Sequence, residues 1–104
     1  MQKGFNSDVY VQGVQHHVQT EDWGFDNPWV VTRVFRKGLV VESVKMPYSD
    51  ILKTGNQFLL LRSPDAMNRA IRSAMLDQHR ATIDKLVAAA RALGLEVSMM
   101  EPIP

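Results

Sequence analysis

Two adjacent histidines, His16 and His17, stand out first, because an imidazole ring can bind a metal ion or transfer a proton. If they lie on a strand, their side chains point to opposite faces and cannot easily share one metal. A third ligand would have to come from elsewhere in the chain: His79, Asp8, Glu21 or Asp22. These residues lack zinc-type spacing, so we predict no metal site, a hydrogen-bonded core position for His16 and an ion pair with Asp8 for His17.

The neighbouring acids Glu21 and Asp22 could in principle form a general acid and base pair. Such a pair needs both carboxyl groups to converge on one substrate position, and adjacent side chains at the end of a strand usually diverge. No nucleophile lies close to them, and the chain has no cysteine. We therefore predict no catalytic residue, and expect Asp22 and Asp26 to accept backbone amides of a turn.

Three aromatic residues, Trp23, Phe25 and Trp29, surround the same turn. They can close one end of a sheet, or they can stay exposed and anchor a protein partner, since Trp is enriched in interface hot spots. The acidic residues around them disfavour nucleic acid, whose phosphates they would repel. The candidate interaction surface predicted from the sequence consists of His17, Glu21, Asp22, Trp23, Phe25 and Trp29.

The elements that must position these residues begin with a hairpin. After a polar lead over residues 1–6, expected to fray, Ser7–Val11 and Val14–Thr20 flank the turn-forming pair Gln12-Gly13. This turn predicts three cross-strand pairs: Val11 with Val14, Val9 with His16, and Asp8 with His17. One face of the hairpin then collects most of the valines and the other is polar, as a half-buried antiparallel hairpin requires.

A second hairpin is predicted from Trp29–Arg36 and Leu39–Met46 around Lys37-Gly38. A simple two-residue turn places Arg33 opposite Glu42, a cross-strand pair of opposite charge that supports the assignment. Both faces carry apolar residues. One face is therefore expected to meet a helix and the other a partner.

Pro47 should end the sheet, and Tyr48–Thr54 is expected to form one or two helical turns. Ser63-Pro64 indicates the start of a helix, with a capping hydroxyl followed by proline at the first helical position. Gly94 indicates its end. A helix of ~30 residues would be ~45 Å long, so it should either break or project from so small a domain.

The second half of this helix carries apolar side chains at alternating steps of three and four, with one histidine among them: Leu76, His79, Ile83, Leu86, Ala90 and Leu93. This seven-residue repeat is typical of a seam between two helices, and it predicts self-association. A helix that kinks near Asp77–Arg80, with both halves on one core, would explain the same pattern.

Composition indicates a single domain over residues 1–104: 104 residues with 45% hydrophobic residues and a net charge of +1. It divides into a β-meander (1–46), a connection (47–62), a long helix (63–94) and an edge strand or tail (95–104). The predicted fold class is α+β, a four-stranded antiparallel meander of two hairpins packed by one long C-terminal helix, with a possible extra edge strand at residues 95–100. No charge excess favours nucleic acid, and no apolar run indicates a membrane span or a leader, so a cytoplasmic location is expected.

The strand His17-Val18-Gln19-Thr20-Glu21-Asp22, followed by Val31–Phe35 and Lys37-Gly38, resembles a small bacterial domain family that has an "HVQTED" strand. The resemblance extends to the step Met75-Leu76-Asp77-Gln78-His79 in the helix. It implies the meander-and-helix fold and carries over no activity or cofactor. From the seven-residue repeat of the helix, the two apolar faces of the second hairpin and the aromatic residues of the turn, we expect a non-enzymatic protein-interaction or regulatory module that forms a homodimer. The alternative is a small-molecule or metal-binding domain that uses the polar face of His17, Asp8, Glu21 and Asp22.

Overall fold

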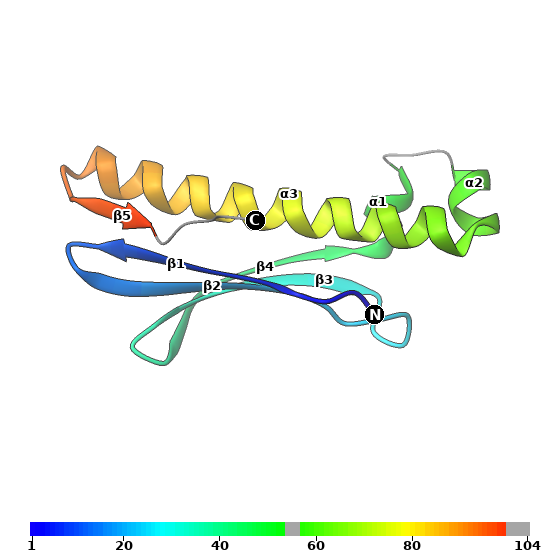
Figure 1. Ribbon diagram of the computed structural model, residues 1–104, viewed down its shortest axis with the longest axis horizontal. Coiled ribbons are helices and arrows are strands. Elements are labelled where there is room, and N and C mark those ends of the chain that lie inside the picture. The colour runs from blue at the N-terminus through cyan, green and yellow to red at the C-terminus, as the bar shows by residue number, and fades with distance from the viewer. Residues whose placement is uncertain (54–56, 100–104) are drawn as a thin grey trace.

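A five-stranded antiparallel sheet carries one long helix along one of its faces (Figure 1). The computed structural model describes residues 1–53 and 57–99, and only the backbone of residues 57–59. The strand order is β4-β3-β2-β1-β5. The predicted α+β class and four-stranded meander are confirmed. The elements are β1 (Phe5–Val11), β2 (Val14–Asp22), β3 (Trp29–Arg36), β4 (Leu39–Pro47), α1 (Tyr48–Lys53), α2 (Gln57–Arg62), α3 (Pro64–Ala92) and β5 (Val97–Met99).

The first hairpin, β1–β2, has the predicted register, with Val11 opposite Val14 and Asp8 opposite His17. Its turn holds Gln12 and Gly13 at φ 52° and 75°. Two consecutive left-handed residues give the tight turn whose twist matches a hairpin, and glycine adopts this conformation without a Cβ clash. The strand starts at Phe5, two residues earlier than predicted. The expected frayed lead is instead held in place, since the backbone amide of Gln2 donates to a carboxylate oxygen of Asp22 at 2.7 Å.

The second hairpin, β3–β4, forms with a different register from the predicted one. Phe35 lies opposite Val40, as a two-residue turn requires, but a bulge then shifts the ladder, and Val34 lies opposite Glu42. The predicted Arg33–Glu42 pair is therefore wrong. Glu42 instead accepts a hydrogen bond from Lys85 of α3 at 2.9 Å. A bulge adds one residue to one strand and increases the local bend, which a count from the turn cannot foresee.

Helix α3 starts and ends where the sequence predicts. The Ser63 side chain accepts the amide of Ala66 at 3.2 Å, Pro64 opens the first turn, and Gly94 follows at φ 75°. The 29-residue helix is continuous. It neither breaks nor projects, because the molecule is elongated, at 48 × 23 × 21 Å, and α3 runs along its longest axis (Figure 1).

The connection from the sheet to α3 contains two short helices, α1 and α2. The expected turns from Tyr48 are present as far as Lys53, and their predicted end at Thr54–Asn56 lies outside the described residues. Beyond α3, β5 pairs with Val9–Val11 of β1, which confirms the possible edge strand predicted for residues 95–100 over Val97–Met99. None of the helices in the described ranges is long and apolar enough to cross a membrane.

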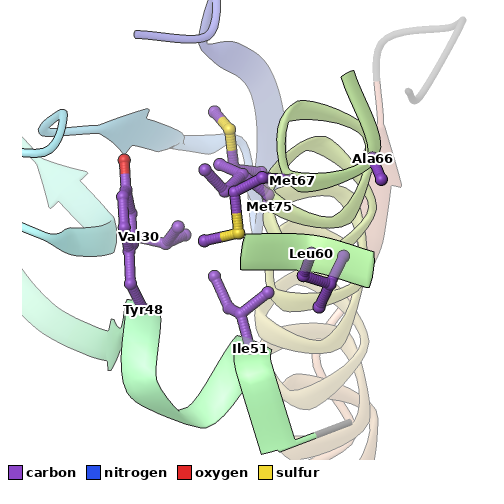
Figure 2. Packing of buried hydrophobic residues seen from close by; sticks show 8 residues of the cluster. Val30, Tyr48, Ile51, Leu60, Ala66, Met67 and Met75 are labelled. Atoms are coloured by element: carbon purple, nitrogen blue, oxygen red, sulfur yellow. The ribbon is translucent and has the colours of Figure 1, made fainter. Parts of the chain in front are cut away.

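The core consists of two hydrophobic clusters along α3. The first lies where α1, α2 and the start of α3 meet the sheet, and Figure 2 shows its side chains converging. Its buried members are Val30, Tyr48, Ile51, Leu60, Ala66, Met67, Ile71 and Met75. The second lies under the C-terminal half of α3 and consists of Val9, Val18, Val34, Ile83 and Val87. Between them, α3 presents polar side chains to the sheet.

The predicted self-association seam on α3 is wrong for three of its members. His79, Ile83 and Ala90 are buried against the chain's own sheet, and Leu86 packs beside them. Leu76 is half-buried and Leu93 is exposed. The seven-residue spacing therefore reflects an intramolecular packing surface. The apolar stripe can drift around α3 without a kink because the sheet beneath it is twisted.

Candidate functional site

The middle of α3 contacts the sheet through a chain of hydrogen bonds that joins five polar side chains. His79 lies within 2.8 Å of Ser7 Oγ through Nε2, and within 2.8 Å of Thr20 Oγ1 through Nδ1. Thr20 and Thr32 are joined at 2.7 Å, and the amide nitrogen of Gln78 donates to Thr32 Oγ1 at 3.0 Å. All five residues are buried. We call this set the polar row.

The hydrogen bonds of the polar row can be ordered from Gln78, whose amide nitrogen can only donate. One pattern that gives every side chain a partner has Thr32 accept from Gln78 and donate to Thr20, and Thr20 donate to Nδ1 of His79. In this pattern Nε2 of a neutral His79 carries the proton and donates to Ser7. Every member then has a partner, in keeping with the absence of unsatisfied buried side-chain atoms among the described residues.

The pair Ser7–His79 has the residue types of a nucleophile and its base, but its arrangement does not suit catalysis. A base must accept the proton of the nucleophile, whereas in the pattern above His79 donates to Ser7. Both residues are buried, and neither lines any of the grooves found among the described residues. We therefore assign the polar row to stability and to the position of α3 on the sheet.

Burial lowers the pKa of His79 from 6.5 to about 4, and the nearby His17 contributes in the same direction. The folded chain therefore keeps His79 neutral over a range of pH in which the unfolded chain binds a proton. Stability should fall as the pH drops from 6.5 to 4, by about 2–3 kcal/mol. Urea denaturation of wild type and His79→Asn at each pH measures this. The difference between the two chains should change with pH, and a constant difference would contradict the assignment.

A second buried polar group, Asp22, ties three segments together. Its carboxylate accepts the amide of Gly24 at 3.0 Å, the hydroxyl of Tyr48 and the amide of Gln2. Burial, followed by the hydrogen bond to Asp22, raises the pKa of Tyr48 above its ordinary value of 10. Asp22 therefore holds a turn, as predicted. Its prediction as part of an exposed interaction surface is wrong, because alternation along β2 turns its side chain toward α1.

The other face of the sheet has no helix over it in the described structure (Figure 1). On this face the Trp23 ring lies between two cations, with Arg33 at 5.3 Å and Lys45 at 5.1 Å from its centroid. Lys45 also lies 6.0 Å from the ring of Trp29. Val31 is fully buried although its side chain belongs to this face. The sheet therefore presents an aromatic and cationic surface, which we call the open face.

The predicted surface residues are only partly brought together. His17 and Glu21 are at alternate positions of β2, and both lie on the open face. Trp23 and Trp29 lie at one end of this face, where the amide of Trp23 donates to the carbonyl of Trp29 at 3.0 Å. Phe25 is exposed in the turn, and its ring meets Tyr48 edge-on with centroids 5.3 Å apart. Asp22 alone points to the covered side.

The two histidines of β2 have separate surroundings, as expected. His16 is buried, and its Nδ1 lies 3.0 Å from the carbonyl of Val14. His17 lies on the open face, with Nδ1 2.8 Å from Asp8 and Nε2 3.1 Å from the side-chain oxygen of Asn6. This contact, above all its hydrogen bond, lowers the pKa of Asp8. Both ring nitrogens of His17 are already engaged, so neither is free to bind a metal.

Next to His17 a shallow groove of about 670 Å³ lies between the two hairpin tips. Gln15, Gln19, Phe35 and Lys37 contribute to its lining. The side-chain amides of both glutamines already donate to carboxylates within the chain, at Asp8 and Glu21. Among the described residues no three His, Asp or Glu side chains gather closely enough to hold a metal ion.

The tip of hairpin β3–β4 bends away from α3 and leaves apolar side chains in solvent (Figure 1). Leu39, Val40 and Val41 are 69%, 52% and 48% exposed. They lie on β4, which forms one edge of the sheet and has no neighbour on its outer side in the described structure. An edge strand of nine residues with exposed apolar side chains is a ready template for pairing with another strand.

Sequence reasoning missed the polar row, although part of its signal was present. Ser7 and Thr20 fall on the valine face of the first hairpin, where a polar side chain needs a partner from another element. His79 of the helix is the partner of both. Its two hydrogen bonds join residues that are 72 and 59 positions apart, and the pattern within one element does not reveal contacts over such separations.

No protein-family model matches the chain, and no curated protein or solved structure matches it significantly.

Proposed function

We propose that this chain is a non-enzymatic protein-interaction module that self-associates through the edge of β4. The carrying observation is the exposed apolar run at Leu39–Val41 on an unpaired strand edge. Soluble proteins usually protect such an edge with charges, proline or a covering segment. Here the only charged side chains of β4 are Glu42 and Lys45, and both are already engaged, with Lys85 and with the two tryptophans.

A second copy of the chain suits this edge. Two β4 strands related by a two-fold axis run antiparallel, so each offers its free backbone groups to the other, and the two sheets become continuous. Leu39–Val41 of each copy would then be covered by the partner's β4, with one such contact at each end of the interface. The open face would extend across both copies and carry one Trp23 and Trp29 surface at each end for a further protein partner.

Replacing Val40 by aspartate is expected to weaken the dimer about a hundredfold or more, because two charges are then buried without partners in each symmetric interface. The folded monomer should lose little stability, since Val40 is already half exposed in the single chain. Light scattering after size exclusion reports the mass of each variant. Ala88→Asp, on the exposed side of α3, adds the same charge away from β4 and should leave the mass unchanged.

Equal masses for wild type and Val40→Asp at every concentration would count against pairing through β4. If Ala88→Asp lowers the mass as much as Val40→Asp does, the change is a general effect of charge.

The alternative function, a small-molecule site beside His17, has less support. Asp22 points away from the face that carries Asp8 and His17, so the predicted polar set is divided. The groove there offers side-chain groups that mostly bond within the chain, as described above. Protein interaction accounts for both the open face and the β4 edge.

A further inference from the structure

A second edge of the sheet is incompletely paired in the described structure. β5 covers only Val9–Val11 of β1, and β1 continues back to Phe5. The outer side of Phe5–Asp8 therefore has no neighbouring strand among the described residues. An extended peptide placed there would continue the line of β5 and pair with β1 in the same antiparallel sense.

A groove of about 570 Å³ lies directly beside this edge, between β1 and the N-terminal half of α3. Phe5 and Leu76 give it apolar walls, and Arg69 and Arg72 bring two positive charges. None of its lining residues in the described structure is acidic. A groove of this composition is complementary to an occupant with a negative charge next to an apolar side chain.

The arrangement of Arg72 is fixed before any partner binds. Its guanidinium lies 4.3 Å from the centroid of the Phe5 ring and donates to the carbonyl of Lys3 at 2.6 Å. Arg69, one turn earlier on α3, has no ion-pair partner among the described residues. A guanidinium that is already fixed in place loses less side-chain entropy when it binds a carboxylate than a mobile guanidinium does.

We propose that the Phe5–Asp8 edge and the Arg69–Arg72 groove bind an extended segment of a partner protein that carries an apolar residue followed, two positions later, by Asp or Glu. The spacing of two follows from alternation, because residues i and i+2 of an added strand point to the same side. The order of the apolar residue and the acidic residue follows from the direction of the added strand. A strand antiparallel to β1 passes Leu76 before it reaches Arg72 and Arg69.

This inference rests on the proposed interaction function but uses a different surface. Pairing through β4 and peptide binding at β1 can therefore fail separately, and the peptide experiment is repeated on the Val40→Asp chain. If that chain still binds the peptide, the β1 site stands whatever the outcome for the dimer.

The probe is a short fluorescein-labelled peptide of alternating Ser and Val with a central Leu-Ser-Glu, titrated with the full chain and followed by anisotropy. A matched peptide with Gln in place of Glu should bind about tenfold more weakly, and Arg69→Gln should weaken the Glu peptide by a similar factor. Arg69→Gln is the main variant because Arg72 also contacts Phe5 and Lys3. Arg91→Gln, on the last turn of α3, is the matched control and should bind like wild type.

Amide hydrogen exchange locates the peptide, and residues 5–8 should become slower to exchange when it binds. Equal affinity for the Glu and Gln peptides would overturn the proposal, as would protection that appears on β4 alone. Residues 100–104 follow β5 and include Glu101. If Glu101→Gln raises the affinity for the peptide tenfold or more, the groove belongs to the chain's own segment and the partner proposal fails.

Discussion

Replacing His79 by alanine is expected to lower the free energy of unfolding by about 3–5 kcal/mol. The imidazole is fully buried between the two hydrophobic clusters, and its ring lies 5.8 Å from that of Phe5. Its removal leaves a cavity, takes away the partner of Ser7 and leaves Thr20 with Thr32 alone, all in a buried environment. Both losses lower the free energy of unfolding, because the site is enclosed between α3 and the sheet.

Chemical denaturation of wild type and variant measures this difference directly. Asp77→Ala, two positions earlier on the exposed side of α3, is the matched control and should change stability by less than about 0.5 kcal/mol. His79→Gln retains an acceptor and a donor and should recover part of the loss. A loss for His79→Ala no greater than that of Asp77→Ala would show that the polar row contributes nothing.

Replacing Asp22 by alanine is expected to cost about 2–4 kcal/mol. One carboxylate receives the N-terminal lead through Gln2, the turn through Gly24 and the start of α1 through Tyr48. Alanine leaves three donors without an acceptor, two of them in the buried interior, and water cannot replace all of them. The variant should also release residues 1–4, which will then exchange their amide hydrogens faster.

Asp22→Asn separates charge from geometry, since its side-chain oxygen can still accept from Gly24 or Tyr48. It should lose less stability than Asp22→Ala. Asp26→Ala, in the exposed part of the same turn, serves as the control and should be near neutral. If Asp22→Ala and Asp26→Ala unfold at the same denaturant concentration, Asp22 does not hold the three segments together.

The elements that local rules determine could be predicted from the sequence. The β1–β2 register follows from the turn Gln12-Gly13, because a two-residue turn sets the pairs that follow it wherever no bulge intervenes. The ends of α3 follow from Ser63, Pro64 and Gly94, whose backbone preferences act within one turn. These positions need no knowledge of the rest of the chain.

Features that depend on distant contacts could not be predicted. The bulge at Val34 and Phe35 changes the β3–β4 register, and with it Glu42 contacts Lys85 of α3 instead of lying opposite Arg33. The periodicity of α3 shows that one side is buried, but the same pattern suits packing against a second helix or against a sheet. The pattern therefore predicts that His79 and Ile83 contact a partner chain, whereas both are buried within their own chain.

Part of the candidate surface could also be predicted. Alternation along β2 places His17 and Glu21 on one face, and the open face joins them to Trp23 and Trp29. The same alternation turns Asp22 to the other side, where Tyr48 meets it. The exposure of Leu39–Val41 depends on the bend of the hairpin away from α3, and only the three-dimensional arrangement reveals it.

Self-association through β4 can be measured on the unmodified chain by sedimentation equilibrium over a wide range of concentration. The mass should rise from that of one 11.8 kDa chain to twice that value and then stay constant, because a two-fold interface closes at two copies. A mass that stays at one chain up to the highest concentration would contradict self-association.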